Sequence, residues 1–260
     1  MALKRLGIIL VIVLPILAAV ITVVLRTDLL VSILMFFGVP TVYLTIRNPG
    51  IFKKSLVFAL LLSVPLSVFV DTLAAINGSW VIPASVFPFR LFGVATVEVY
   101  LFGLLWVLYA ILCYEHFLDG GQRGDTLSSQ IRYLGWISVA LLIYVGAGVL
   151  FDNELLHIPF FYILVGIVLV VIPLIVFIVY YPVFWRTFAI IGVYFFYLLS
   201  LFELAALATG QWIFPGSDFI GFVRLFGLRM PIEEVAIWML LATASLLSYY
   251  EFFGDNRSIG

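Results

Sequence analysis

Long apolar runs separated by short polar segments make up most of the chain. Runs of spanning length lie at about 6–25, 28–47, 55–75, 91–114, 131–151, 158–181, 184–207 and 229–250. A helix needs about 20 mostly apolar residues to cross the hydrocarbon of a bilayer. The pattern therefore predicts an all-α integral membrane protein with about eight transmembrane helices. The third and seventh helices are expected to continue into the loops that follow them.

The second half of the chain repeats the first at a nearly constant offset. An ordered set of matches of this kind indicates an internal duplication. It predicts two fused four-helix repeats, 1–117 and 131–260, joined by a cytoplasmic linker at 118–130. Because four is an even number, the two repeats enter the membrane from the same side and are parallel. The matched segments are Asn77–Pro83 with Thr209–Pro215, Arg90–Gly93 with Arg224–Gly227, Tyr114–Phe117 with Tyr250–Phe253, and, as single residues, Pro40 with Pro173, Pro49 with Pro182, Asp71 with Glu203 and Glu98 with Glu234.

Composition agrees with a membrane protein and argues against a nucleic-acid partner and an internal disulfide. Hydrophobic residues make up 65% of the chain and charged residues only 10%, whereas soluble domains carry about 25% charge. The net charge of -1 suggests no nucleic-acid partner, and the single cysteine excludes an internal disulfide.

The distribution of Lys and Arg predicts the orientation of the chain in the cell membrane. Cytoplasmic loops carry the excess of these residues, which favours a multi-pass protein with both termini in the cytoplasm. The cytoplasmic side then holds Lys4, Arg5, Arg47, Lys53, Lys54, Arg123, Arg132, Arg186 and Arg257, and the other side holds Arg26, Arg90, Arg224 and Arg229.

Five carboxylates are expected at one depth, near the end of the helices opposite the termini. Seventeen residues separate Glu234 from Glu251, and Asp71 from Lys54, which is about 26 Å of helix. Two interpretations are open. In one, the acids are interfacial, neutralised by arginines, with Pro231 in the first turn of the last helix. In the other, they form a cluster at the mouth of a cavity between the halves, where burial and like charge keep one acid protonated. The five acids are Asp71, Glu98, Glu203, Glu233 and Glu234.

The remaining residues restrict the chemistry. No lysine lies within the middle of a helix, which excludes a retinal Schiff base. His116 and His157 are expected on opposite sides of the membrane, so no metal centre is predicted. No G-x-G-x-x-G segment supports a nucleotide or flavin, and no cofactor is expected.

Phe, Trp and Tyr make up 17% of the chain, either as lipid-facing side chains or as the walls of a cavity. A carboxylic acid can protonate a carbon–carbon double bond, and aromatic faces can hold the resulting cation. These residue types suit cofactor-free isomerisation or cyclisation of a polyene.

The segment Phe202–Glu251 contains an acid, then Gly-x-Trp, then Pro-x-Glu-Glu at the start of an expected helix that ends in Tyr-Glu. These residues are Glu203, Gly210, Trp212, Pro231, Glu233, Glu234, Tyr250 and Glu251, with Asp71, Gly78, Trp80, Glu98, Tyr114 and Glu115 as their weaker counterparts in the first half. The segment resembles the repeated domain of the membrane lycopene cyclases, which occur as heterodimers or fused chains in some bacteria, archaea and fungi. The first half resembles this domain more weakly, because "ATVEVY" (Ala95–Tyr100) lacks the proline and the second acid of the motif.

The resemblance implies that one end of lycopene is protonated within the membrane and closes to a ring, giving a monocyclic or bicyclic carotene. Glu233 or Glu234 would be the proton donor, and the other acid or Glu98 the base. The supporting residues would be Asp71, Glu203, Pro231, the cation-stabilising or interface-anchoring Trp80 and Trp212, and the carboxylate-orienting Arg90 and Arg224. The expected partners are the lipophilic polyene, membrane lipid, and a second copy or other enzymes of carotenoid synthesis.

Three alternatives remain at this point. The chain could be a cyclase or isomerase of another isoprenoid, a non-catalytic proton-coupled carrier, or a structural subunit that binds isoprenoid lipid. The acids lie near one end of the helices, whereas transport sites usually lie near the bilayer midplane.

Overall fold

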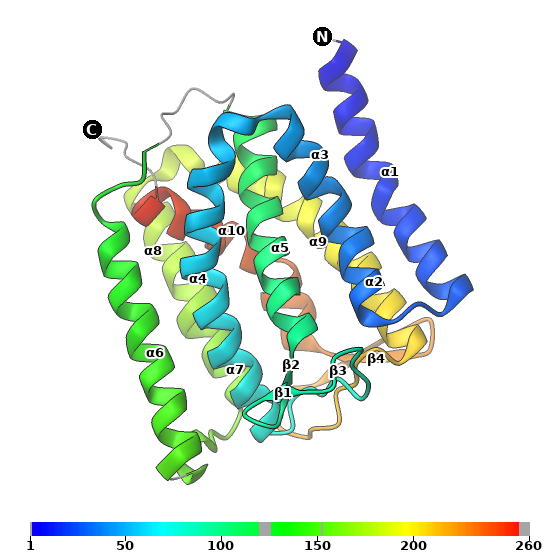
Figure 1. Cartoon of the computed structure of the whole chain (residues 1–260), viewed down its shortest axis with the longest axis vertical. Coiled ribbons are helices and arrows are strands. Elements are labelled where there is room, and N and C mark those ends of the chain that lie inside the picture. Colours follow the sequence, from blue (N-terminus) through cyan, green and yellow to red (C-terminus); the bar gives the residue numbers. More distant parts are fainter. Residues whose placement is uncertain (1, 120–125, 152, 255–260) are drawn as a thin grey trace.

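The computed structural model describes residues 2–119, 126–151 and 153–254, with side chains from Gly7 onward. Its helices form one bundle, with two small β-hairpins at one end (Figure 1). Helix α1 begins at the opposite end of the bundle, where the last helical segment also ends. Of the charges used to predict orientation, Arg123 and Arg257 lie outside the described residues, as do the side chains of Lys4 and Arg5.

Seven helical segments of the described chain are long and apolar enough to cross a membrane. The protein is therefore a helical membrane protein, as the apolar pattern predicts. Four of these segments are α1 (Ala2–Leu25), α4 (Pro49–Ile76), α5 (Val97–Tyr114) continued by the π-helix η2 (Glu115–Asp119), and α6 (Ile131–Phe151). The others are α2 (Leu29–Ile33) with η1 (Leu34–Gly38) and α3 (Val39–Arg47), α7 (Phe161–Gly166) with η4 (Ile167–Val171) and α8 (Ile172–Tyr180), and η5 (Pro182–Phe184) with α9 (Trp185–Thr209). The short 3-10 helix η3 (Asn153–Leu156) follows α6.

The eighth apolar run, at 229–250, is not one continuous helix. It begins with strand β4 (Leu228–Pro231) and continues as the π-helix η6 (Glu234–Met239), the α-helix α10 (Ala242–Tyr249) and the π-helix η7 (Tyr250–Gly254). Leu240 and Leu241 form a turn between η6 and α10. The expected helix is therefore corrected to a broken one that starts after Pro231. The fourth run is also shortened, because Arg90–Thr96 forms a hairpin before α5 begins.

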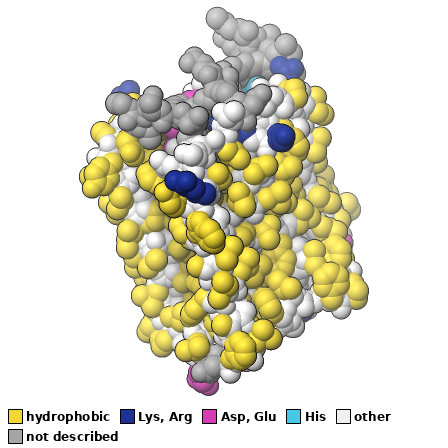
Figure 2. Space-filling view, turned by 60° about the vertical axis from the view of Figure 1, so that its left-hand side comes forward, with side chains coloured by type: hydrophobic (Ala, Val, Ile, Leu, Met, Phe, Trp, Pro, Cys, Tyr) yellow, Lys and Arg dark blue, Asp and Glu magenta, His cyan; other side chains and the backbone are white. Residues whose placement is uncertain are grey.

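The outer faces of the helices are apolar. On α6, Trp136 is 70% exposed and Leu150 is 75% exposed. In Figure 2, hydrophobic side chains cover most of the visible face of the bundle. A large exposed apolar surface is unusual for a soluble protein and is what lipid contact requires.

The two hairpins occupy the two "RLFG" segments. Strand β1 (Arg90–Leu91) pairs with β2 (Ala95–Thr96), and β3 (Phe222–Leu225) pairs with β4. In the second hairpin, Phe226 and Gly227 form a two-residue loop, and both have positive φ, at 52° and 81°. This is the backbone of a type I′ turn, which joins twisted strands tightly and favours glycine. Phe92 and Gly93 in the first hairpin also have positive φ, at 51° and 75°.

Other backbone features recur at matched places of the two halves. The π-helices η1 and η4 each precede a proline-containing helix, with Pro40 in α3 and Pro173 in α8. The packing is reciprocal too, because α1 packs against α9 while α6 packs against α4. Six of the eight positive-φ residues of the described chain fall into pairs that the sequence matches: Gly78 with Gly210, Phe92 with Phe226, and Gly93 with Gly227.

Reciprocal contacts occur at both ends of the bundle. At the end away from the hairpins, Tyr114 donates to Glu251 over 2.5 Å and Tyr250 donates to Glu115 over 2.7 Å. At the hairpin end, Val81 and Ile213 exchange two backbone hydrogen bonds of 3.0 Å. These bonds join the two halves through residues that the sequence matches to each other.

Candidate active site

A cavity of about 140 Å³ lies between the helices, near the ends of α4 and α9 and close to the start of η6. Its wall comes from α4, α5, α7, α9 and η6, and from the two loops that follow α4 and α9. Three carboxyl groups line it, those of Asp71, Glu203 and Glu234. Eight aromatic rings line it as well: Trp80, Phe102, Trp106, Tyr162, Phe202, Trp212, Phe214 and Trp238.

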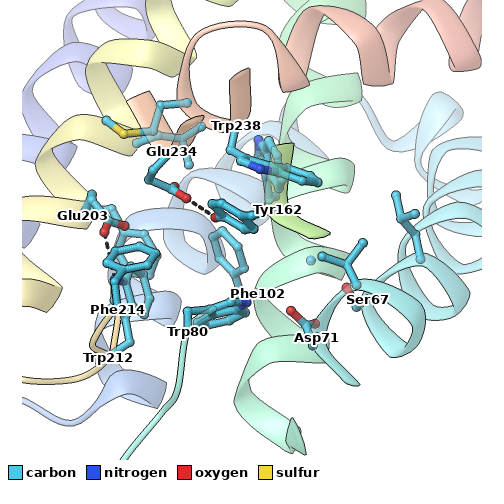
Figure 3. Close-up of a pocket in the computed structure, with 17 residues that line it drawn as sticks. Ser67, Asp71, Trp80, Phe102, Tyr162, Glu203, Trp212, Phe214, Glu234 and Trp238 are labelled. Carbon is cyan, nitrogen blue, oxygen red and sulfur yellow. Dashed lines mark hydrogen bonds between the residues drawn. The ribbon is translucent and has the colours of Figure 1, made fainter. Parts of the chain in front are cut away.

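Glu234 enters the cavity from the π-helix η6. The hydroxyl group of Tyr162, on α7, donates a hydrogen bond to Glu234 (Figure 3). The Tyr162 ring stacks on Trp238, with ring centroids 5.4 Å apart. This stacking fixes the tyrosine ring, so the hydroxyl group orients the carboxyl group toward the cavity.

Glu203 lies near the end of α9 and is held by a tryptophan of the following loop. Trp212 Nε1 donates to Glu203 Oε1 over 2.9 Å, and the carboxyl group is buried. The Trp212 ring meets Trp80 edge to face, with centroids 6.1 Å apart. The two tryptophans, matched in the sequence, therefore meet in one cavity wall.

Asp71 lies on α4, across the cavity from Glu203, with aromatic rings between them (Figure 3). It is 9% exposed and makes no hydrogen bond within the described part of the chain. The matched acids therefore differ, since Glu203 is bound by its tryptophan and Asp71 is not bound by Trp80.

Glu98 and Glu233 do not line this cavity. Glu98 accepts hydrogen bonds of 2.8 Å from Ser85 Oγ and from the backbone N–H of Val86. Glu233 accepts a hydrogen bond of 2.6 Å from the backbone N–H of Ile220. Each carboxylate thus holds the loop ahead of its own hairpin. The structure accordingly matches Glu98 with Glu233, and not with Glu234 as the sequence comparison suggested.

The arginines do not take the places expected of them. Arg90 donates to the carbonyl oxygens of Ile82 and Val94 over 2.8 and 3.0 Å, so it braces a loop and does not orient a carboxylate. Arg224 is exposed on β3. Pro231 is the last residue of β4 and precedes the helix, whereas a place in the first helical turn was expected. Pro231 is still paired with Phe222 in the second hairpin, so the helix begins only after it.

Only Trp80 and Trp212 of the eight lining aromatic residues were singled out by the sequence analysis. The other six are Phe102, Trp106, Tyr162, Phe202, Phe214 and Trp238. Phe214 lies in the repeated segment Thr209–Pro215, whereas the other five belong to no repeated segment and lie within runs of apolar residues. The one available signal is the spacing of Trp238 from Glu234, because residues four apart share one face of a helix.

The arrangement can donate protons to a bound apolar molecule and stabilise positive charge in it. Although three carboxyl groups line the cavity, the described residues contain no group of three or more His, Cys, Asp or Glu placed to hold a metal ion. Buried carboxyl groups supply acids and bases, and the ring faces attract cations.

A comparison of the chain with family models, with curated proteins and with solved structures finds no match.

Proposed function

We propose that this protein is a carotenoid cyclase that closes the linear ends of lycopene, or of a related carotenoid, within the membrane without a cofactor. The observation that carries the proposal is the cavity itself, in which three carboxyl groups face eight aromatic rings among membrane-spanning helices. The resemblance of Phe202–Glu251 to the membrane lycopene cyclases suggests the same substrate.

Glu234 is the proton donor in this proposal. Its carboxyl group lies in the cavity, and the Tyr162 hydroxyl group holds it in place. The proton adds to the terminal double bond of the end group, and the cation formed is attacked by a second double bond, which closes the ring. The faces of Trp80, Trp212 and Trp238 stabilise the positive charge. Loss of a different proton then restores neutrality, so the product is an isomer of the substrate.

The same proposal includes two four-helix repeats that share one site. The reciprocal contacts support an approximate two-fold axis along the bundle, with the broken last segment as the eighth crossing. The cavity lies on this axis, since matched residues line it from both halves, such as Asp71 with Glu203. With both termini cytoplasmic in the cell membrane, the hairpins and the cavity lie toward the outer side.

The test is to express the chain in a bacterium that accumulates lycopene and to separate the pigments by chromatography. We expect new monocyclic or bicyclic carotenes, absent from cells with an empty vector. Unchanged lycopene, with the protein present in the membrane fraction, would refute lycopene cyclisation. The same membranes with linear carotenoids of other lengths would then test the wider substrate class.

A further inference from the structure

A second, smaller cavity lies beside the first, under the first hairpin. Its volume is about 30 Å³. A water molecule needs roughly 10–15 Å³ of such space, so this cavity has room for about two waters. It is lined by Asp71, Ala75, Trp80, Val81, Ile82, Val94, Ala95, Thr96 and Val99.

Of the three carboxyl groups in the first cavity, only that of Asp71 also lines the second. Asp71 and Trp80 together form the wall that the two cavities share. Asp71 therefore faces the first cavity, with its aromatic rings, on one side and the second cavity, next to β2, on the other. Strand β2 follows the exposed turn at Phe92 and Gly93, at the end of the bundle.

The smaller cavity also has a polar group with no protein partner. Thr96 is 1% exposed, and its Oγ1 has no hydrogen-bond partner in the described part of the chain. A buried hydroxyl group without a hydrogen-bond partner destabilises the fold. Water between Asp71 and Thr96 would remove that cost, and the carboxylate and the hydroxyl group supply the polar contacts that buried water needs.

We propose that Asp71 is the base that ends the reaction, and that the second cavity is the water path through which its proton leaves. This inference rests on the proposed function. Asp71 removes a proton from a carbon next to the cationic centre. The electron pair of that C–H bond becomes the ring double bond, and the Asp71 carboxylate becomes a carboxylic acid. Asp71 then passes the proton to water in the second cavity, and Glu234 regains one from solvent.

The other two acids are less suited to this step. Glu234 is held by Tyr162 and does not line the second cavity. Glu203 is held by Trp212 and does not line the second cavity. Of the three acids that line the first cavity, Asp71 is the one whose carboxyl group is bound by no other side chain of the described residues. It also adjoins the second cavity, which has room for water.

The position of the base determines which ring proton is lost, so the ring type reports on Asp71. Asp71→Asn should lower ring formation at least ten-fold at equal protein level, since general bases contribute about 10²–10⁴. Asp71→Glu moves the carboxyl group by about 1.5 Å. It should restore part of the activity and change the ratio of ring double-bond isomers. A merely structural role would not alter that ratio.

The water path is tested by Thr96→Val, with Thr72→Val as its matched control. Thr72 follows Asp71 on α4 and is also buried without a partner for its Oγ1 in the described chain, but it lines neither cavity. Thr96→Val should slow turnover several-fold and leave the ring type unchanged, while Thr72→Val should match the wild type.

The outcomes separate the two proposals. A wild-type chain that forms no rings in any carotenoid tested would overturn the proposed function and this inference with it. A wild-type chain that forms rings, with Asp71→Asn equally active, would overturn the role of Asp71 alone. Equal rates for Thr96→Val and Thr72→Val would overturn the water path.

Discussion

Replacing Glu234 by glutamine distinguishes this residue from its neighbour Glu233 as the proton donor. The amide has nearly the same size as the carboxyl group, and its oxygen can still accept the hydrogen bond from Tyr162. The fold around η6 should therefore persist. An amide cannot protonate a double bond, and a positioned general acid contributes about 10²–10⁴ to the rate. The expected loss is thus about 2.7–5.4 kcal/mol of transition-state stabilisation.

Glu233→Gln is the matched control, one residue away. Glu233 is 1% exposed and lies outside the cavity, where Oε1 accepts from the backbone N–H of Ile220 over 2.6 Å. The amide oxygen can accept the same bond. We expect Glu233→Gln to keep the rate of ring formation within about three-fold of the wild type, since the hydrogen bond to Ile220 is kept and residue 233 does not line the cavity.

The assay is the initial rate of ring formation in membranes that contain lycopene, corrected for the amount of protein. Detergent extraction and size-exclusion chromatography show whether each variant is folded. The reasoning would be refuted if Glu234→Gln kept its activity while Glu233→Gln lost it, because the donor would then lie outside the cavity seen in the structure.

Four further variants test the surroundings of the site. Tyr162→Phe keeps the ring stacking but removes the hydrogen bond to Glu234, so ring formation should fall about 3–30-fold at unchanged protein yield, as measured in the same membranes. Arg90→Ala should lower the melting temperature in detergent, because charged hydrogen bonds contribute about 1.5–3 kcal/mol. Arg224→Ala, at the matched but exposed position, should not lower it. A Cβ at Gly216 would lie 2.7 Å from a carbonyl oxygen of the other loop, so Gly216→Ala should also lower the melting temperature, and an unchanged value would contradict the close approach of the loops.

The helices were predictable because the apolar runs have the length that a bilayer demands. The depth of the acids followed from the rise of a helix, and it placed Asp71, Glu203 and Glu234 at the level where the cavity lies. Which acids enter the cavity was not predictable. Glu233 and Glu234 are neighbours in sequence, yet one holds a loop and the other lines the cavity. That difference arises from the direction of each side chain, which the apolar pattern does not contain.

The aromatic residues show the same limit. Trp80 and Trp212 were singled out because a repeated motif surrounds them, and both line the cavity. Tyr162 was not, since it is one of 13 tyrosines and lies in a run of apolar residues. Its role depends on a hydrogen bond to a residue 72 positions away, and only tertiary packing brings the two together.

One additional residue accounts for the break in the last helix. Glu98 and Glu233 hold equivalent loops, and Tyr114 and Tyr250 make reciprocal bonds at the other end of the bundle. Between these anchors the first half advances 16 positions (114 − 98) and the second advances 17 (250 − 233).

The helical segments from Glu98 to Tyr114 and from Glu233 to Tyr250 connect the same two ends of the bundle. The second segment must therefore fit one more residue into the same length. A π turn does this, because it takes up an extra residue without lengthening the helix by a full rise, and such turns are frequent at functional sites. The π-helix η6 is where this happens, and Glu234 is its first residue. At the matched position the first half has Val99, which lines the second cavity and not the first. The insertion and the added acid therefore occur together, and they make the two matched halves differ at the cavity, where Glu234 enters from the second half and no acid enters from the equivalent position of the first.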